Sequence, residues 1–217
     1  MKPGFTEPAD FGKYQIGFGV FFQDPLAFTF RLCKYKFIWR HLKETDNVLE
    51  LACGDGLGSY MLATKAQSVL GTDISPSFID YANQYFKRDN LSFQAIDALN
   101  SAFNTKYDVA VLCGLLEYFT DEQTDLVMRN VLNALTPEGI AFVGTTSKAS
   151  YPYASERRKA THLKEYMGNE LAAMLSKFFH RVDVFTVNDE VIALTFPNLS
   201  YNLMAKCSYP KKLTIDN

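Results

Sequence analysis

The run from Glu50 to Gly58, ELACGDGLG, carries the clearest chemical signal in the sequence. Gly54, Gly56 and Gly58 occupy every second position where an apolar segment ends and a helical pattern begins. Glycine allows a positive φ and lets a ligand approach the backbone closely. A strand, a glycine turn and a helix N-terminus in this order predict a ligand site at the carboxyl end of the strand.

The residues around this turn indicate the charge of the ligand. The fingerprint of dinucleotide-binding proteins has a further glycine where this chain has Ser59. Glu50, an acid near the end of the strand, repels a pyrophosphate and suits a cationic ligand. A nicotinamide-dependent oxidoreductase is therefore the weaker alternative, and a cationic cofactor is the stronger one.

Four later segments also place acidic residues or turns next to predicted strands. Asp73 ends a predicted strand within LGTDIS, and Asp97 ends the next predicted strand within AIDAL. Taken singly, Asp73 is also compatible with a helix N-cap and Asp97 with a solvated loop acid. The segments YDVAVLCGLLEYF and LTPEGI add a fourth strand and the turn before a fifth.

In this combination and order, residues 47–207 resemble the class I S-adenosylmethionine (SAM)-dependent methyltransferases. The resemblance implies SAM as cofactor, S-adenosylhomocysteine as product and an in-line transfer of the methyl group. It also implies that Glu50 holds the amino group of SAM, directly or through water, and that Asp73 accepts hydrogen bonds from the ribose. The implied cofactor-binding residues are Glu50, Ala52, Gly54, Gly56, Asp73, Ile74, Asp97, Ala98 and Cys113.

Three residues are candidates for the acceptor side of the reaction. His162, in THLKEY, follows a polar loop and matches an H-x-(R/K)-E-(Y/F) segment of similar methyltransferases. Two roles are open for His162: it acts as a base or contacts the substrate, or its side chain only forms a hydrogen bond with a loop backbone. Glu117 either faces the acceptor or is an exposed loop acid. Tyr118 stands where the family often has histidine, and it is a poorer base at neutral pH.

The acceptor class follows from weaker signals. The tail, VNDEVIALTFP and SYNLMAKC, resembles methyltransferases of lipopolysaccharide and capsule synthesis, which favours a sugar or glycan precursor over other small molecules. The basic run 157–159 is interpreted as a solvated face, with an anionic acceptor as the alternative. A non-catalytic SAM-binding partner protein stays open as an alternative function.

The pattern of the remaining residues predicts the elements that carry these side chains. Strands are expected at 47–53, 68–73, 91–97, 107–113, 139–146, 181–187 and 201–207. Helices are expected at 25–42, 57–66, 77–87, 120–135 and 162–179, the last broken near Gly168, with a turn at 136–139 and an irregular stretch at 147–160. The predicted fold is α/β: a Rossmann-like, seven-stranded, mostly parallel sheet with an antiparallel edge hairpin and helices on both faces.

Composition limits the class of protein. The 217 residues suit one domain, with residues 1–46 as a lid or helical lead-in and 47–207 as the core. Tyr14, Phe18, Phe21 and Phe22 suit a lid over SAM, core packing or a homodimer contact. A net charge of −2, no long apolar run and four scattered cysteines favour a cytoplasmic protein without nucleic-acid, membrane or metal partners.

Overall fold

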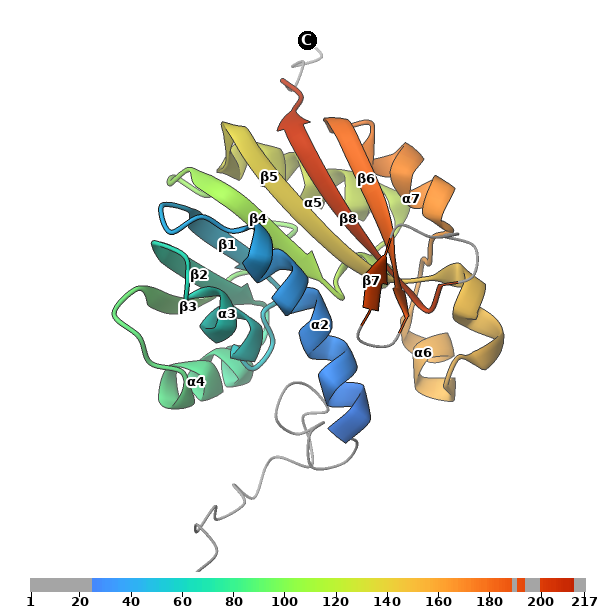
Figure 1. Cartoon of the computed structure of the whole chain (residues 1–217), viewed down its shortest axis with the longest axis horizontal. Coiled ribbons are helices and arrows are strands. Elements are labelled where there is room, and N and C mark those ends of the chain that lie inside the picture. The colour runs from blue at the N-terminus through green and yellow to red at the C-terminus, as the bar shows by residue number, and fades with distance from the viewer. Residues whose placement is uncertain (1–24, 189–190, 194–199, 213–217) are drawn as a thin grey trace, which may run out of the picture.

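A computed structural model describes residues 25–188, 191–193 and 200–212 (Figure 1). Eight strands form one sheet in the order β3-β2-β1-β4-β5-β8-β6-β7. The strands are β1 (Asn47–Leu51), β2 (Ser68–Asp73), β3 (Leu91–Ala95), β4 (Tyr107–Cys113), β5 (Leu135–Thr146), β6 (Phe179–Asn188), β7 (Val191–Ala193) and β8 (Asn202–Pro210). The helices are α2 (Pro25–His41), α3 (Leu57–Leu62), α4 (Pro76–Tyr85), η1 (Leu116–Tyr118), α5 (Asp121–Ala134), η2 (Lys148–Tyr153), α6 (Glu156–Thr161) and α7 (Gly168–Leu175).

The order of the parallel strands creates a switch point at β1. The chain runs from β1 outward to β2 and β3, then returns to place β4 and β5 on the other side of β1. All five strands are parallel, so their carboxyl ends lie along one edge of the sheet. In open α/β sheets this edge, beside the switch point, is where ligands bind.

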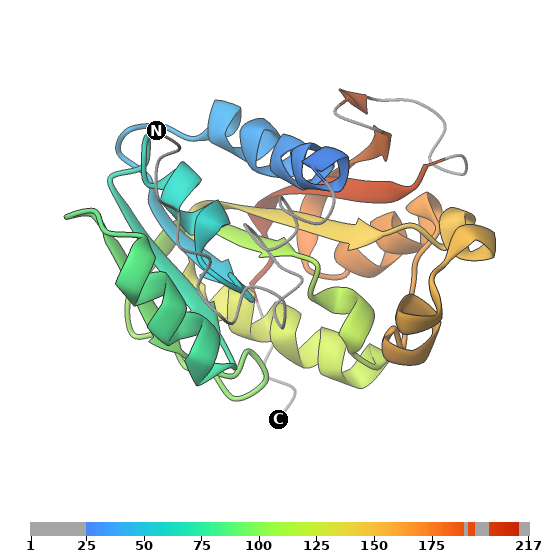
Figure 2. The same cartoon turned by 90° about the horizontal axis from the view of Figure 1, so that it is seen from below.

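An apolar core lies on each face of the sheet, between the strands and the helices that cover them. Alternation along β1 sends Leu49 and Leu51 into a core that includes residues of α5 and α7. Val48 packs on the opposite face with residues of α2 and α3. Figure 2 shows α2 and α5 on opposite sides of the sheet. Both faces are covered, which explains why the strands are almost continuously apolar.

The predicted fold class is confirmed. All seven expected strands are present, and β8 pairs antiparallel with both β5 and β6 to give the expected antiparallel edge. The short β7 adds an eighth strand on β6. The turn expected at 136–139 is a bulge in β5, where the register with β4 shifts between Leu135 and Ile140.

The segment after β5 differs from the prediction. The stretch 147–160, expected to be irregular, contains η2 and α6, and Ser155 caps α6 by accepting a hydrogen bond from the Arg158 N–H. The helix expected at 162–179 spans only Gly168–Leu175. The Met167 N–H donates to Glu170 (2.8 Å), which fixes the start of α7. The helix expected at 57–66 ends at Leu62.

Some expectations fall on undescribed residues. The proposed roles of Tyr14, Phe18, Phe21 and Phe22, and of the residues before α2 in general, lie outside the described ranges. In the ranges that the structure describes, no helix has both the length and the apolar character needed to cross a membrane.

Gly58, the last glycine of the run, packs against α2. A Cβ atom at this position would lie 2.1 Å from the ring of Tyr35, well inside van der Waals contact. The Tyr35 ring therefore packs directly on the backbone of α3. The last glycine of the run is required for contact between two helices, rather than for contact with a ligand.

We predict that Gly58→Ala lowers the free energy of unfolding by about 1–3 kcal/mol, because the added methyl group displaces the Tyr35 ring. Helix propensity alone favours alanine by about 1 kcal/mol. In a Tyr35→Ala background the same change should therefore be neutral or stabilising. Urea unfolding of the four proteins measures both effects, and an equal cost of Gly58→Ala in the two backgrounds would contradict the contact.

Candidate functional site

The loop between β1 and α3 has an unusual backbone. Ala52, Gly54 and Gly56 have φ values of 58°, 56° and 88°. Glycine adopts this region freely, but alanine at Ala52 does so against steric resistance. The loop is therefore held open at the carboxyl end of β1 at some cost to stability, as is common at ligand sites.

Asp73 is the acid that the structure joins to this loop. Its Oδ2 accepts a hydrogen bond from the Gly54 N–H (3.0 Å) and its Oδ1 accepts one from the Ser75 N–H (2.9 Å). The residue is 8% exposed, at the end of β2. The carboxylate lies beside the glycine turn, as the resemblance implies, and each oxygen keeps a lone pair for a hydroxyl donor.

Four other predicted cofactor residues lie at or just after the ends of neighbouring strands. Ile74, directly after Asp73, is 69% exposed and presents an apolar surface. Asp97 is half-buried and accepts hydrogen bonds from Leu99 N–H (2.9 Å) and the Asn100 side chain (2.7 Å), while Ala98 is buried. Cys113 ends β4, and burial raises the pKa of its thiol to about 12, so it is a neutral group.

Glu50 is fully enclosed by the protein. The side chain has no exposed surface. Its Oε2 accepts a hydrogen bond from Ser59 Oγ (2.5 Å) and its Oε1 accepts one from the Tyr35 hydroxyl (2.8 Å). It lies between β1, α2 and α3, and each of its oxygens is already bonded to a side chain from one of those helices. Ser59, noted in the sequence only as a missing glycine, is a partner of this carboxylate.

Glu117 connects the ends of two strands. It is 4% exposed, so it is not the exposed loop acid of the alternative interpretation. Its carboxylate accepts hydrogen bonds from Thr145 (3.0 Å) and Thr146 (3.3 Å) at the end of β5. Its backbone carbonyl accepts from the N–H groups of Leu163 (2.8 Å) and Lys164 (3.2 Å). Glu117 thereby places the segment after His162 beside the ends of β4 and β5.

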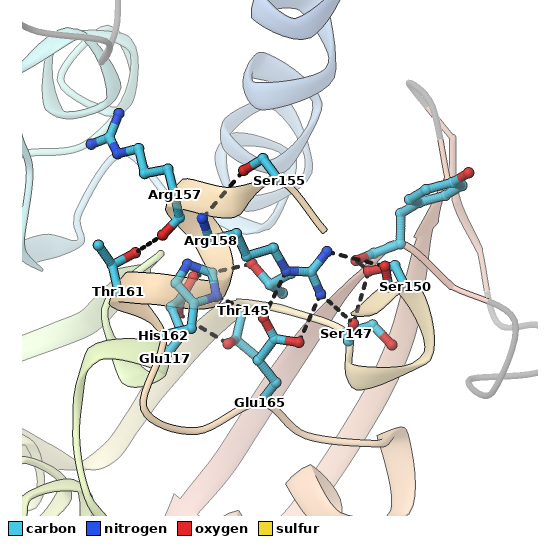
Figure 3. A network of polar contacts seen from close by, with 12 residues as sticks. Glu117, Thr145, Ser147, Ser150, Ser155, Arg157, Arg158, Thr161, His162 and Glu165 are labelled. Atoms are coloured by element: carbon cyan, nitrogen blue, oxygen red, sulfur yellow. Dashed lines mark hydrogen bonds and ion pairs between the residues drawn. The ribbon is translucent and has the colours of Figure 1, made fainter. Parts of the chain in front are cut away.

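His162 belongs to a buried polar network (Figure 3). Its Nδ1 lies 2.7 Å from Glu165 Oε1. Arg158 binds the same carboxylate with two N–H groups, at 2.7 Å each. The side chains of Arg158, His162 and Glu165 are 15%, 10% and 6% exposed. The basic run is therefore not a uniformly solvated face, because Arg158 points inward and binds Glu165.

Tyr118 lies against this histidine. The two rings meet edge to face with centroids 5.3 Å apart, and Tyr118 is 44% exposed. Burial and the nearby Glu117 raise the pKa of Tyr118, despite the opposing charges of Arg157 and Arg31. Tyr118 therefore keeps its proton at neutral pH and is a hydrogen-bond donor rather than a base.

The sequence-derived residues thus fall into two groups. Asp73 and Gly54 meet at the turn after β1, while His162, Tyr118 and Glu117 meet after β4. Sequence analysis missed Arg158 and Glu165 as partners of His162. The spacing His162–Glu165 was visible, but the connection to Arg158 depends on how α6 folds back.

The pH dependence of stability provides a test of the Glu50 environment. Burial raises the pKa of Glu50 from 4.5 to about 7, although hydrogen bonds from Ser59 and Tyr35 act to lower it. Between these two values the folded chain binds a proton that the unfolded chain has released. The stabilising contribution is therefore complete below pH 4.5 and is lost as the pH rises through 7.

We predict that raising the pH from 4.5 to 7.5 costs the wild-type chain roughly 3 kcal/mol more stability than it costs Glu50→Gln, which has no proton to lose. Urea unfolding across this range measures the difference. Glu44→Gln, a change at an exposed glutamate, should keep the wild-type pH dependence. Parallel curves for wild type and Glu50→Gln would show that Glu50 does not titrate in this way.

Comparison with known proteins supports the same interpretation of the turn. A family model described as a methyltransferase domain matches residues 48–139. The chain is 24% identical to malonyl-(acyl-carrier protein) O-methyltransferase of Acetivibrio thermocellus over 124 residues, which is 54% of this chain and 43% of that protein. It is 26% identical to ubiquinone biosynthesis O-methyltransferase of Rickettsia akari over 117 residues, which is 53% of this chain and 45% of that protein. The match spans less than half the length of these relatives.

Solved structures share the architecture over most of the chain. The N-methyltransferase NodS from Bradyrhizobium japonicum, in complex with S-adenosyl-L-homocysteine, has a TM-score of 0.66 at 19% identity, covering 83% of this chain and 86% of that one. The DhpI–SAH complex has a TM-score of 0.68 at 18% identity, covering 94% and 93%. The matched domain contains the glycine turn, Asp73 and Glu117. Residues 48–139 are thus similar to a methyltransferase domain, and the chain has the fold of these solved methyltransferase structures.

Proposed function

We propose that this chain binds SAM at the carboxyl edge of β1 and β2 and transfers its methyl group to a small-molecule acceptor at the end of β4 and β5. The observation that carries the proposal is the hydrogen bond from the Gly54 N–H to Asp73 (3.0 Å), which joins the glycine turn to an acid at the strand end. An acid beside a turn with positive φ values suits a neutral ribose and a cationic amino acid better than a pyrophosphate.

The residues present fit this cofactor. Asp73 would accept hydrogen bonds from the ribose hydroxyls, and the exposed Ile74 would cover the adenine. Asp97 and Ala98 would lie near the adenine amino group, and Cys113 would add a neutral contact. Gly54, Gly56 and Ala52 would give the cofactor access to the backbone. Glu50 would act on the amino group from behind Tyr35 and Ser59, through water or after a movement of Tyr35.

The chemistry divides between cofactor and protein. When bound, SAM supplies an activated methyl group on a sulfonium ion. The protein has to align the acceptor and exclude water. His162 would contact the acceptor and take its proton, while Tyr118 would donate a hydrogen bond to it. Glu117 holds the backbone after His162 in place through its carbonyl.

A sugar or glycan precursor is the acceptor class that we favour. The names of the two curated relatives point to O-methylation, whereas NodS is an N-methyltransferase, so similarity leaves the acceptor open. Near the end of β5, Tyr151, Tyr153 and Tyr201 are 46%, 78% and 54% exposed. The rings of Tyr153 and Tyr201 are 6.3 Å apart. Exposed aromatic faces of this kind suit the apolar C–H face of a sugar ring.

We also propose that the protein works in the cytoplasm. All four cysteines, Cys33, Cys53, Cys113 and Cys207, are free thiols, and three of them are buried. Unpaired thiols fit a reducing compartment, where SAM is available to the enzyme.

We predict that SAM and S-adenosylhomocysteine bind the protein and that NAD does not, as measured by isothermal titration calorimetry. Asp73→Ala should weaken SAM binding by about 1–3 kcal/mol, because two ribose hydrogen bonds are lost. Asp80→Ala, which changes an exposed aspartate of α4, is the control and should bind as wild type does. NAD binding without SAM binding would refute the proposed cofactor, and full affinity in Asp73→Ala would refute the assignment of Asp73.

A methylation screen with labelled SAM across sugars, amines and phenols identifies the acceptor. If the acceptor is a sugar, Tyr153→Ala should raise its KM by about 2- to 12-fold with kcat unchanged, corresponding to the loss of one aromatic contact of about 0.5–1.5 kcal/mol. Tyr85→Ala, at an exposed tyrosine on α4, should leave KM unaltered. Turnover of amines alone would count against a glycan acceptor. An equal KM for the sugar in wild type and Tyr153→Ala would also count against it. SAM binding with no turnover of any acceptor class would favour a non-catalytic protein.

A further inference from the structure

The network around His162 fixes the orientation of one ring nitrogen. Glu165 Oε1 lies 2.7 Å from His162 Nδ1 and also accepts from Arg158 Nε (2.7 Å). Glu165 Oε2 accepts from a second Arg158 nitrogen (2.7 Å). One carboxylate is thus shared between a guanidinium and an imidazole, in a region where all three side chains are at most 15% exposed.

The ionisation of Glu165 determines which nitrogen of His162 carries hydrogen. Burial raises the pKa of Glu165, but the hydrogen bonds from Arg158 and His162 outweigh it, and the pKa is lowered. An ionised carboxylate only accepts hydrogen bonds. Nδ1 of His162 must therefore be the donor, and in the neutral ring Nε2 carries the lone pair.

Arg158 anchors this pair to the sheet. Beyond its two bonds to Glu165, its guanidinium donates to the backbone carbonyls of Ser147 (2.9 Å) and Ser150 (3.3 Å), directly after β5 (Figure 3). A planar guanidinium that makes four directed bonds has little freedom to rotate. On the other side, the Leu163 N–H donates to the Glu117 carbonyl (2.8 Å). The backbone just after His162 is thus held by Glu117, and the Glu165 side chain that contacts His162 is held by Arg158.

We propose that Arg158 and Glu165 are positioning residues that present Nε2 of His162 as a base, and that the acceptor atom is accordingly a hydroxyl oxygen. The inference rests on the proposed methyltransferase function and adds to it the acceptor group and two residues. Arg158 and Glu165 act through His162 and do not touch the acceptor.

The chemistry of the acceptor is what makes an oriented base useful. A neutral amine already has a lone pair for a methyl group, so it needs little more than alignment. An aliphatic hydroxyl is a poor nucleophile while it holds its proton, and a positioned base contributes about 10²- to 10⁴-fold. A buried Arg–Glu–His arrangement is unnecessary for an amine and is well suited to a hydroxyl.

The proton and electron balance is complete without another reactant. The hydroxyl gives its proton to Nε2 of His162, and an oxygen lone pair forms the new C–O bond. The C–S bond breaks and its electron pair stays on sulfur, so the sulfonium becomes a neutral thioether. His162, now an imidazolium beside the Glu165 carboxylate, later releases the proton to solvent.

The first test reads the tautomer of His162 without any reaction. In ¹⁵N-labelled wild-type protein, ring nitrogen shifts should show hydrogen on Nδ1 of neutral His162. In Glu165→Gln they should show a mixture or the opposite tautomer, because the ionised acceptor is gone. His41 is an internal control, since its Nδ1 lies 2.8 Å from the Phe37 carbonyl and far from Glu165 in the chain. Its shifts should not change.

The second test measures turnover with matched hydroxyl and amine acceptors. His162→Ala and Glu165→Gln should lower kcat for the hydroxyl acceptor, by about 10²- to 10⁴-fold for His162→Ala and by a smaller factor for Glu165→Gln. Arg158→Lys keeps the charge but loses the two-pronged contact, so it should lie between wild type and Glu165→Gln. Glu156→Gln, which removes a carboxylate from the exposed pair with Lys159, should react as wild type does.

The outcomes separate this inference from the proposed function. An unchanged His162 tautomer in Glu165→Gln, a hydroxyl turnover rate insensitive to Glu165, or turnover of amines alone would overturn it while leaving the methyltransferase proposal standing. Absence of SAM binding in the wild-type protein would overturn the proposed function itself. Thermal unfolding of each variant shows whether it is folded. If Glu165→Gln is not folded, the same tautomer and rate measurements on Arg158→Lys decide.

Discussion

The burial of the Glu50 carboxylate constrains much of this molecule. A charge taken out of water is costly unless hydrogen bonds compensate it. Here hydrogen bonds from Tyr35 of α2 and Ser59 of α3 offset only part of that cost, because the pKa of Glu50 stays raised, but they tie two helices to β1 through one side chain. The close approach of Tyr35 in turn requires Gly58 to lack a side chain. The glycine turn is therefore shaped by the helical layer above it as much as by a ligand.

The parallel half of the fold was predictable because its signals are local. Apolar runs, strand-end acids and a capping box formed by Thr120 and Gln123 indicate β1 to β5 and their helices from short stretches of sequence. The segment after β5 was not predictable in the same way. The residues just after His162 have helical periodicity, but Leu163 and Lys164 donate their backbone N–H groups to Glu117, and this long-range pairing outweighs the local pattern.

The candidate site shows the same division. The positions of Asp73 and Gly54 follow from strand ends alone, and the structure joins them by a hydrogen bond. Glu50 stays a predicted contact of the cofactor's amino group, and the sequence did not show that Tyr35 and Ser59 would bond its carboxylate. Arg158 was interpreted as part of a charged surface. Only the folding of α6 toward the end of β5 turns its guanidinium onto Glu165.

Glu117 restrains the motion of the loop that follows His162. Its side chain is bonded to Thr145 and Thr146, and its carbonyl is bonded to the backbone that follows His162. Separating that loop from the protein requires breaking its two hydrogen bonds to the carbonyl of a residue that is itself bonded to the end of β5. The amide hydrogens of Leu163 and Lys164 should therefore exchange with solvent more slowly than those of an ordinary surface loop.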